Sequence, residues 1–168
     1  MPETEPKSQN TWINRLERDL GAHWIALRKA RDTTNAKRDA LQKAFSGDIA
    51  PDTTLVLFGS IAREEMTSGS DTDWLLLVDG QAFPQHLDQQ HAIAEKLHKL
   101  GFERPSRSGA FGRMVGSHDI VHEIGGEDDT NSNTTRRVLL LLESFPVGNR
   151  EAYDRVRRQV LNRYLREG

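Results

Sequence analysis

Two short apolar runs flank a glycine–serine turn and a pair of aspartates near the middle of the chain. The first run, residues 55–58, stops at Gly59-Ser60, and the second, residues 74–78, directly follows Asp71-Thr72-Asp73. Apolar runs of this length, bounded by turn residues, are typical of buried strands. Because strand side chains alternate, aspartates at i and i+2 point to the same face. The pattern predicts two buried strands, the second of which carries both carboxylates.

The aspartates and the turn are groups that bind a metal ion and phosphate. Mg²⁺ takes one or two carboxylates and keeps its other positions for water and substrate phosphate. A Gly-Ser turn that leads into a short helix offers backbone N–H groups to a phosphate. We therefore expect Asp71 and Asp73 to hold Mg²⁺, with Mn²⁺ as an alternative ion. The helix is expected over residues 61–66, with Ser60 as its cap.

The segment resembles the DNA-polymerase-β-like nucleotidyltransferase superfamily, in which Gly-Ser or Gly-Gly is followed, after a gap, by Asp-x-Asp and an apolar run. The residues that match this signature are Phe58, Gly59, Ser60, Asp71, Asp73 and Trp74. Thr72 is polar where the superfamily usually has an apolar residue. The segment is most similar to the bacterial uridylyltransferase and adenylyltransferase group that modifies nitrogen-regulatory proteins, and to its uncharacterised relatives. The resemblance covers residues 55–78, about one seventh of the chain.

Three residues after the turn refine the comparison with that group. Arg63 and Glu65 match it, whereas Glu64 stands where those proteins usually carry glycine. The sequence leaves two roles open for Arg63, a phosphate clamp or an ion-pair partner of Glu65. The resemblance assigns Gly59, Ser60 and Arg63 to nucleotide binding.

The resemblance also implies a fold and an activity. The fold is α/β, a small mixed β-sheet of about four or five strands flanked by helices. The activity is Mg²⁺-dependent transfer of a nucleoside monophosphate from a nucleoside triphosphate (NTP) such as ATP to a hydroxyl of a protein or small molecule. Asp71 and Asp73 would be both the metal ligands and the catalytic residues. In this superfamily a third carboxylate usually joins them from a neighbouring strand.

Residues 111–126 are the candidate source of that third carboxylate. As a strand, this stretch places Asp119 and Glu123 on one face and His118 and His122 on the other. Asp119 is the first candidate for a third catalytic and metal-binding acid, and Glu123 is the second.

The same stretch contains an imitation of a zinc motif. His118 and His122 match the H-E-x-x-H signature, with Asp119 in place of glutamate, but that signature requires a helix. Glycines at 116, 125 and 126 leave little room for one, and the chain has no cysteine. The sequence therefore favours two strand histidines over a zinc site.

Two other functions stay open beside the enzyme. One is a non-catalytic or regulatory protein of the same fold that acts through protein contact, as in an antitoxin. The other is an aminoglycoside nucleotidyltransferase, which uses the same core with an acidic pocket. The intact Gly59-Ser60 turn and both aspartates favour an enzyme, because a binding module gains nothing from two adjacent like charges.

The 168 residues suffice for one domain, which we expect over residues 10–150. Residues 1–9 are expected to be disordered, and residues 151–168 to form a helix that starts a missing helical domain or binds a helical partner. The chain has no long apolar stretch, no apparent signal peptide and no cysteine, which predicts a cytoplasmic protein without membrane contact. Its net charge of −2 argues against nucleic acid as a partner.

The N-terminal part of the domain is predicted to be helical. Its apolar residues recur every three or four positions: Trp12, Leu16, Leu20, Trp24 and Leu27. We expect this face to pack onto the sheet or another domain, with a break at residues 33–35 and a second helix over residues 36–45.

Overall fold

The computed structural model describes residues 12–105 and 109–166, so the expected disorder of residues 1–9 lies outside the described residues. The described part contains one four-stranded sheet in the order β3-β2-β1-β4. Its strands are β1 (Thr53–Phe58), β2 (Trp74–Val78), β3 (Arg113–Gly116) and β4 (Ser144–Gly148). β1 pairs antiparallel with β2 and β4, whereas β2 and β3 run parallel. The predicted α/β fold with a mixed sheet is confirmed.

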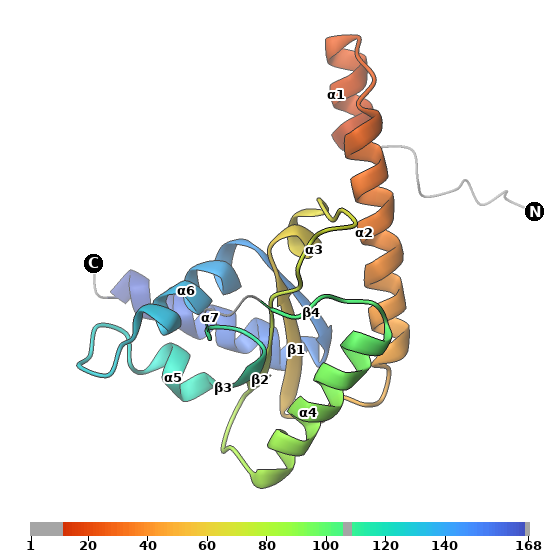
Figure 1. The fold of residues 1–168 in the computed structure, drawn as a ribbon. Helices are drawn as coiled ribbons and strands as arrows, with labels where there is room; N and C mark the ends of the chain where they lie inside the picture. Colours follow the sequence, from red (N-terminus) through yellow and green to blue (C-terminus); the bar gives the residue numbers. More distant parts are fainter. Residues whose placement is uncertain (1–11, 106–108, 167–168) are drawn as a thin grey trace, which may run out of the picture.

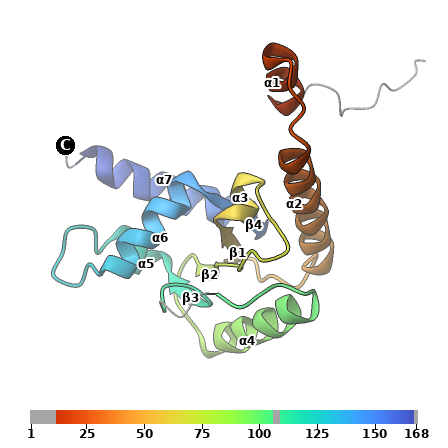
Figure 2. The ribbon, with the colours of Figure 1, turned by 45° about the horizontal axis from the view of Figure 1, so that its top comes forward.

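Helices cover both faces of the sheet (Figures 1 and 2). α2 (Ile25–Ala44) and α4 (Pro84–Lys99) pack on one face, around Leu55, Leu57, Trp74 and Leu76. α5 (Ser117–Val121), α6 (Asn131–Leu142) and α7 (Arg150–Arg166) pack on the other, around Val56, Phe58, Leu75 and Leu77. Every residue of β1 and β2 is buried, which explains their uninterrupted apolar runs.

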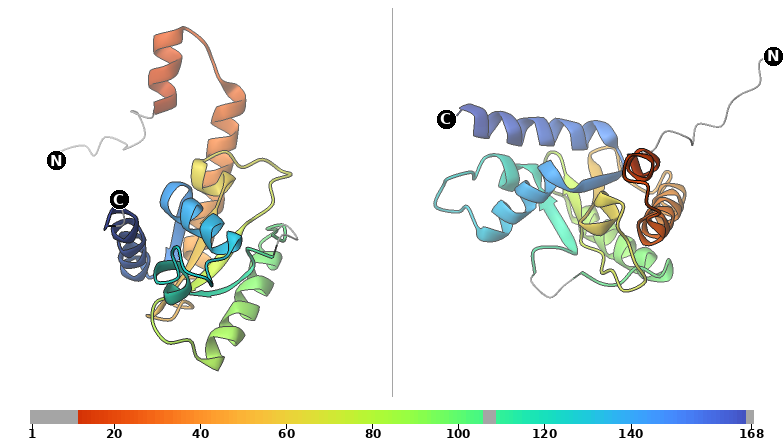
Figure 3. Two further views of the ribbon diagram at one scale, coloured as in Figure 1. Left: turned by 90° about the vertical axis from the view of Figure 1, so that its left-hand side faces the viewer. Right: turned by 90° about the horizontal axis from the view of Figure 1, so that it is seen from above.

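The N-terminal helices extend beyond the sheet, so the predicted packing of their apolar face onto the sheet is wrong. α1 (Trp12–Leu20) and the first turns of α2 stand clear of the other elements (Figures 1 and 3). Trp12 is 54%, Leu20 61% and Trp24 41% exposed. The periodicity identified an amphipathic helix correctly, but it carried no information on whether another element covers that face.

The break between the two helices also differs from the prediction. It falls at residues 21–24, and the expected break at residues 33–35 lies inside α2. Thr34 is completely buried there; its hydroxyl donates to the carbonyl of Ala30 at 2.7 Å and accepts from the N–H of Met66 at 2.9 Å. A threonine that resembled a helix break therefore joins the helix to the segment that follows the glycine turn.

Glu17 connects α1 to the start of α2. Its carboxylate accepts hydrogen bonds from the backbone N–H of Trp24 and from Nε of Arg28, each at 2.9 Å. The bonds from Arg28, and secondly the bond from Trp24, lower the pKa of Glu17 to about 2.

None of the helices in the described residues is both long and apolar enough to span a membrane.

We expect α1 to separate from α2 in acid. The pKa of Glu17 is lower in the folded chain than its ordinary value of about 4.5, so the contact stabilises the helix pair above that pH. This stabilisation is lost as the pH falls from about 4.5 to about 2. Tryptophan fluorescence during an acid titration, with circular dichroism to detect global unfolding, measures the separation. Glu17→Gln lacks the titrating group, and an identical titration of this variant would contradict the assignment.

Candidate functional site

One end of the β1–β2 hairpin brings the glycine turn and the aspartates together. Leu57 pairs with Trp74, and one residue further the N–H of Phe58 donates to the carbonyl of Asp73 at 2.9 Å. β1 therefore ends beside the segment that leads into β2. Four predicted site residues meet at this end of the sheet: Gly59, Ser60, Asp71 and Asp73.

The two aspartates precede β2, which begins at Trp74, so their predicted place within the strand is wrong. The burial of the segment nevertheless alternates. Thr72 is only 1% exposed, whereas Asp71 is exposed and Asp73 is half-buried. The same alternation is expected for two carboxylates that share the side opposite Thr72, and one oxygen of Asp73 is itself buried. The burial of Thr72 also explains why an apolar residue is usual at that position.

Gly59 is required by its backbone conformation. It has φ 70° and ψ −132°, which residues with a Cβ atom rarely adopt. Space is not the reason, because a Cβ added there would be 4.0 Å from the nearest atom outside the adjacent residues, a nitrogen of the Arg63 guanidinium. Ser60 is the first residue of α3 (Ser60–Arg63) and does not cap it, and the helix is shorter than predicted.

The backbone at the end of α3 shows why glycine is usual at the position of Glu64. Glu64 has φ 64° and ψ 34°, a left-handed conformation that suits glycine best. Arg38 of α2 holds this end in place: it donates to the carbonyls of Ile61 and Ala62, at 2.9 and 2.8 Å, and to Glu64 at 3.0 Å. Nε of Arg31 lies 3.3 Å from the other carboxylate oxygen of Glu64. Two ion pairs therefore stabilise a residue whose backbone is strained.

We expect Glu64→Gly to be close to the wild type in stability and Glu64→Ala to be less stable by about 1 kcal/mol. Both variants lose the ion pairs, but only glycine removes the cost of the left-handed conformation. Urea unfolding of the two variants measures the difference. Equal stabilities would show that the backbone at this position is not left-handed in solution.

Arg63 is engaged with carboxylates. Its Nε donates to Glu65 at 2.8 Å, and its Nη1 donates to Glu143, just after α6. These bonds, first with Glu65 and then with Glu143, raise the pKa of Arg63 above its ordinary value. Of the two roles that the sequence left open, the structure contains the ion pair with Glu65. A phosphate contact would require Arg63 to leave one of these partners.

The structure does not bring Asp119 to the aspartate pair. The predicted strand over residues 111–126 ends at Gly116, and Asp119 and its neighbours form α5. β2 and β3 are parallel, with Leu75 beside Arg113 and Val78 beside Gly116. Residues before β2 and residues after β3 therefore lie at opposite ends of the sheet, roughly 16 Å apart at about 3.3 Å per residue. This register contradicts the prediction that Asp119, or Glu123 as the second candidate, is the third acid.

Glu103 is an acid that the structure does place beside the pair. Its backbone forms a parallel β-bridge with Asp71, and its side chain is exposed. Sequence reasoning missed it because it lies in the irregular segment after α4, more than 30 residues from Asp71. Such a bridge has no local sequence signal.

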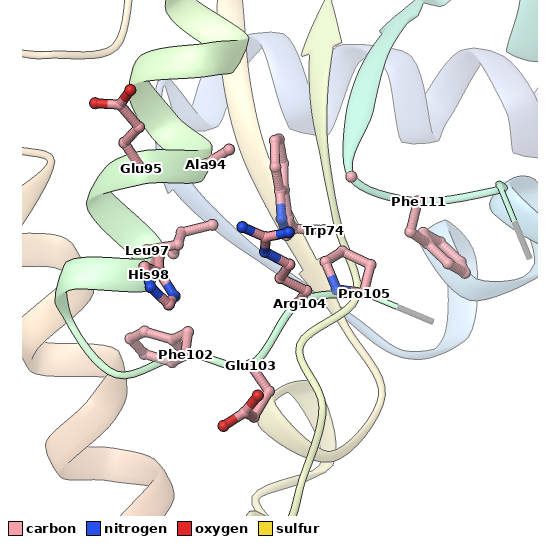
Figure 4. A pocket seen from close by; sticks show the side chains of 11 residues that line it. Trp74, Ala94, Glu95, Leu97, His98, Phe102, Glu103, Arg104, Pro105 and Phe111 are labelled. Carbon is pink, nitrogen blue, oxygen red and sulfur yellow. The ribbon is translucent and has the colours of Figure 1, made fainter. Parts of the chain in front are cut away.

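A cavity of about 400 Å³ adjoins this group of acids (Figure 4). Its lining includes Trp74, Leu97, Phe102, Arg104, Pro105 and Phe111. Figure 4 shows the Arg104 side chain extending toward Trp74. Aromatic walls together with a guanidinium suit a planar ring that carries polar groups.

Residues 37–104 match the model of the nucleotidyltransferase domain family. This stretch contains Arg38, the Gly59-Ser60 turn, both aspartates and Glu103, and it excludes Asp119. The match supports the polymerase-β-like superfamily, with which the mixed sheet and flanking helices agree. No curated protein and no solved structure matches the chain.

Proposed function

We propose that this protein is a Mg²⁺-dependent nucleotidyltransferase that moves a nucleoside monophosphate from an NTP to a hydroxyl of a protein or small molecule. One observation carries the proposal: the Gly59-Ser60 turn and the two aspartates meet at one end of the β1–β2 hairpin, within the residues that match the family. Asp71, which is exposed, and Asp73, which is half-buried, are two acids close together in the chain, and a divalent ion would neutralise their like charges.

In the proposed reaction the acceptor hydroxyl oxygen bonds to the α-phosphorus of the NTP. The bond from that phosphorus to the bridging oxygen breaks, pyrophosphate leaves, and the hydroxyl proton passes to solvent. Gly59 lets the backbone approach the phosphates, and the Ser60 hydroxyl donates a hydrogen bond to them. Asp71 and Asp73 would hold Mg²⁺ or Mn²⁺, which neutralises charge on the phosphates. The cavity beside Trp74 is suited to the nucleobase.

The test is incubation of the protein with each α-labelled NTP, Mg²⁺ or Mn²⁺, and one of two acceptor pools. A cell extract contains protein and small-molecule acceptors, and a set of aminoglycosides tests the antibiotic alternative. Label transferred by the wild type but not by Asp73→Asn supports the proposal. If no NTP yields a labelled product and none raises the melting temperature, the catalytic proposal must be abandoned.

A non-catalytic function through protein contact is favoured by a different observation, the exposed apolar face of the N-terminal helices. Trp12, Leu20 and Ile25 are 54%, 61% and 76% exposed on elements that stand clear of the sheet. In this case Trp12→Ser combined with Ile25→Ser would abolish the biological effect of the protein, while Asp73→Asn would leave it unchanged. If the protein is an enzyme, Asp73→Asn should abolish the effect and the double serine variant should leave it unchanged.

A further inference from the structure

A second group of metal-binding side chains lies at the end of the sheet away from Asp71 and Asp73. His118, Asp119 and Glu123 each offer one ligand atom, and these atoms all lie within 4.8 Å of one another. The first two side chains are exposed and Glu123 is half-buried, so an ion in solution can reach them. The group combines an imidazole nitrogen with two carboxylate oxygens, a ligand set that zinc accepts.

The helical conformation of α5 brings these residues together. On a strand, His118 would face away from Asp119 and Glu123. In the helix that begins at Ser117, residues four apart share a face, so the rings of His118 and His122 have their centroids 5.1 Å apart. The sequence disfavoured zinc for want of a helix, but a helical turn does connect the two histidines: α5 ends at Val121, and the N–H of His122 donates to the carbonyl of His118 at 2.8 Å.

Neighbouring elements position the two carboxylates. The Asp119 carboxylate lies close to Gly116, since a Cβ added to that glycine would be 3.7 Å from one of its oxygens. Glu123 accepts a hydrogen bond at 3.0 Å from Nδ2 of Asn133, a buried residue of α6. Arg136 in turn donates to Oδ1 of Asn133 at 2.8 Å, which fixes the orientation of the amide. Such outer hydrogen bonds are typical of metal sites.

We propose that His118, Asp119 and Glu123 form a Zn²⁺ site. The ligand atoms of His122 lie outside this group, and its ring must rotate toward the ion to supply a fourth ligand. The imidazoles select zinc over Mg²⁺, which prefers oxygen ligands. Zinc–ligand bonds of about 2.0–2.2 Å place ligand atoms roughly 3.3 Å apart, so modest rotation of exposed side chains completes the site. The bound ion links both ends of α5 and, through Glu123 and Asn133, joins them to α6. Its role is to stabilise this layer, independently of nucleotidyl transfer.

The experiment uses the full chain, freed of metal with a chelator and titrated with Zn²⁺ or Mg²⁺ in a calorimeter and in thermal melts. We expect one Zn²⁺ to bind and to raise the melting temperature by about 5 °C or more at a hundredfold excess over Kd. Mg²⁺ should have no such effect at these residues. His118→Ala and Glu123→Gln should abolish the Zn²⁺-dependent shift, and the glutamine can still accept the bond from Asn133.

Asp71→Asn combined with Asp73→Asn is the matched control. This double variant removes the other acidic group and should retain both the Zn²⁺ stoichiometry and the shift. Loss of binding in the double variant would place the ion at the aspartate pair and overturn the proposal. Unchanged binding in both His118→Ala and Glu123→Gln would overturn it as well, since the chain has four further histidines that can bind zinc weakly.

Discussion

Replacing Asp73 with asparagine should lower nucleotidyl transfer by about 1000-fold or more and leave the fold intact. The substitution keeps the shape of the side chain and the backbone bond between Phe58 and Asp73, but it removes one of the two charges proposed to hold the metal ion. A thousandfold loss corresponds to about 4 kcal/mol of transition-state stabilisation, as expected for a lost metal ligand. Asp71→Asn should behave in the same way. Initial rates with the preferred NTP measure both effects.

Thr72→Val is the matched control for these variants. Thr72 lies between the aspartates but faces inward, and its hydroxyl is buried without a hydrogen-bond partner in the described part of the chain. Valine has nearly the same shape, so the transfer rate should be unchanged and stability should rise by about 1 kcal/mol. If Thr72→Val is also inactive, the segment itself is sensitive to change. If Asp73→Asn is active, the proposed metal role is wrong.

The centre of the fold could be predicted because burial there is recorded directly in the sequence. β1 and β2 are buried on both faces, so residues 55–58 of β1 and all of β2 are unbroken apolar runs, and the turn residues between them are equally local signals. The same logic failed after Gly116. Ile120, Val121 and Ile124 are all buried, and their spacing of one and four residues is that of a helix. That spacing was a signal that could have identified α5.

The supports of the candidate site could not be predicted, because they are contacts between distant residues. Arg38, on the helix before β1, donates to the end of α3, which follows β1 in the chain. Glu143 lies 80 residues from its partner Arg63. Glu103 pairs with Asp71 through a backbone bridge. Each side chain is an ordinary surface charge in its own local sequence. Only the arrangement of α2, α6 and the segment after α4 around the hairpin gives these charges their positions.

Gly148→Ala should be among the most destabilising small substitutions in the chain, with a loss of about 4 kcal/mol. Gly148 ends β4 opposite Thr54 and has φ 94°, in the region that favours glycine. A Cβ atom there would lie 2.6 to 2.9 Å from three side-chain atoms of Ile49, which packs against the core. Backbone strain and overpacking each cost about 1–3 kcal/mol. Urea unfolding measures the sum.

Gly125→Ala separates the two contributions. Gly125 has φ 71°, but a Cβ added to it would meet no atom within 4 Å, so only the strain remains. We expect this variant to lose about 1 kcal/mol, with the remaining difference from Gly148→Ala due to the clash with Ile49. Equal losses in the two variants would mean that Ile49 moves aside at little cost. The edge formed by β4 would then be less tightly packed than this close contact between a strand glycine and an isoleucine requires.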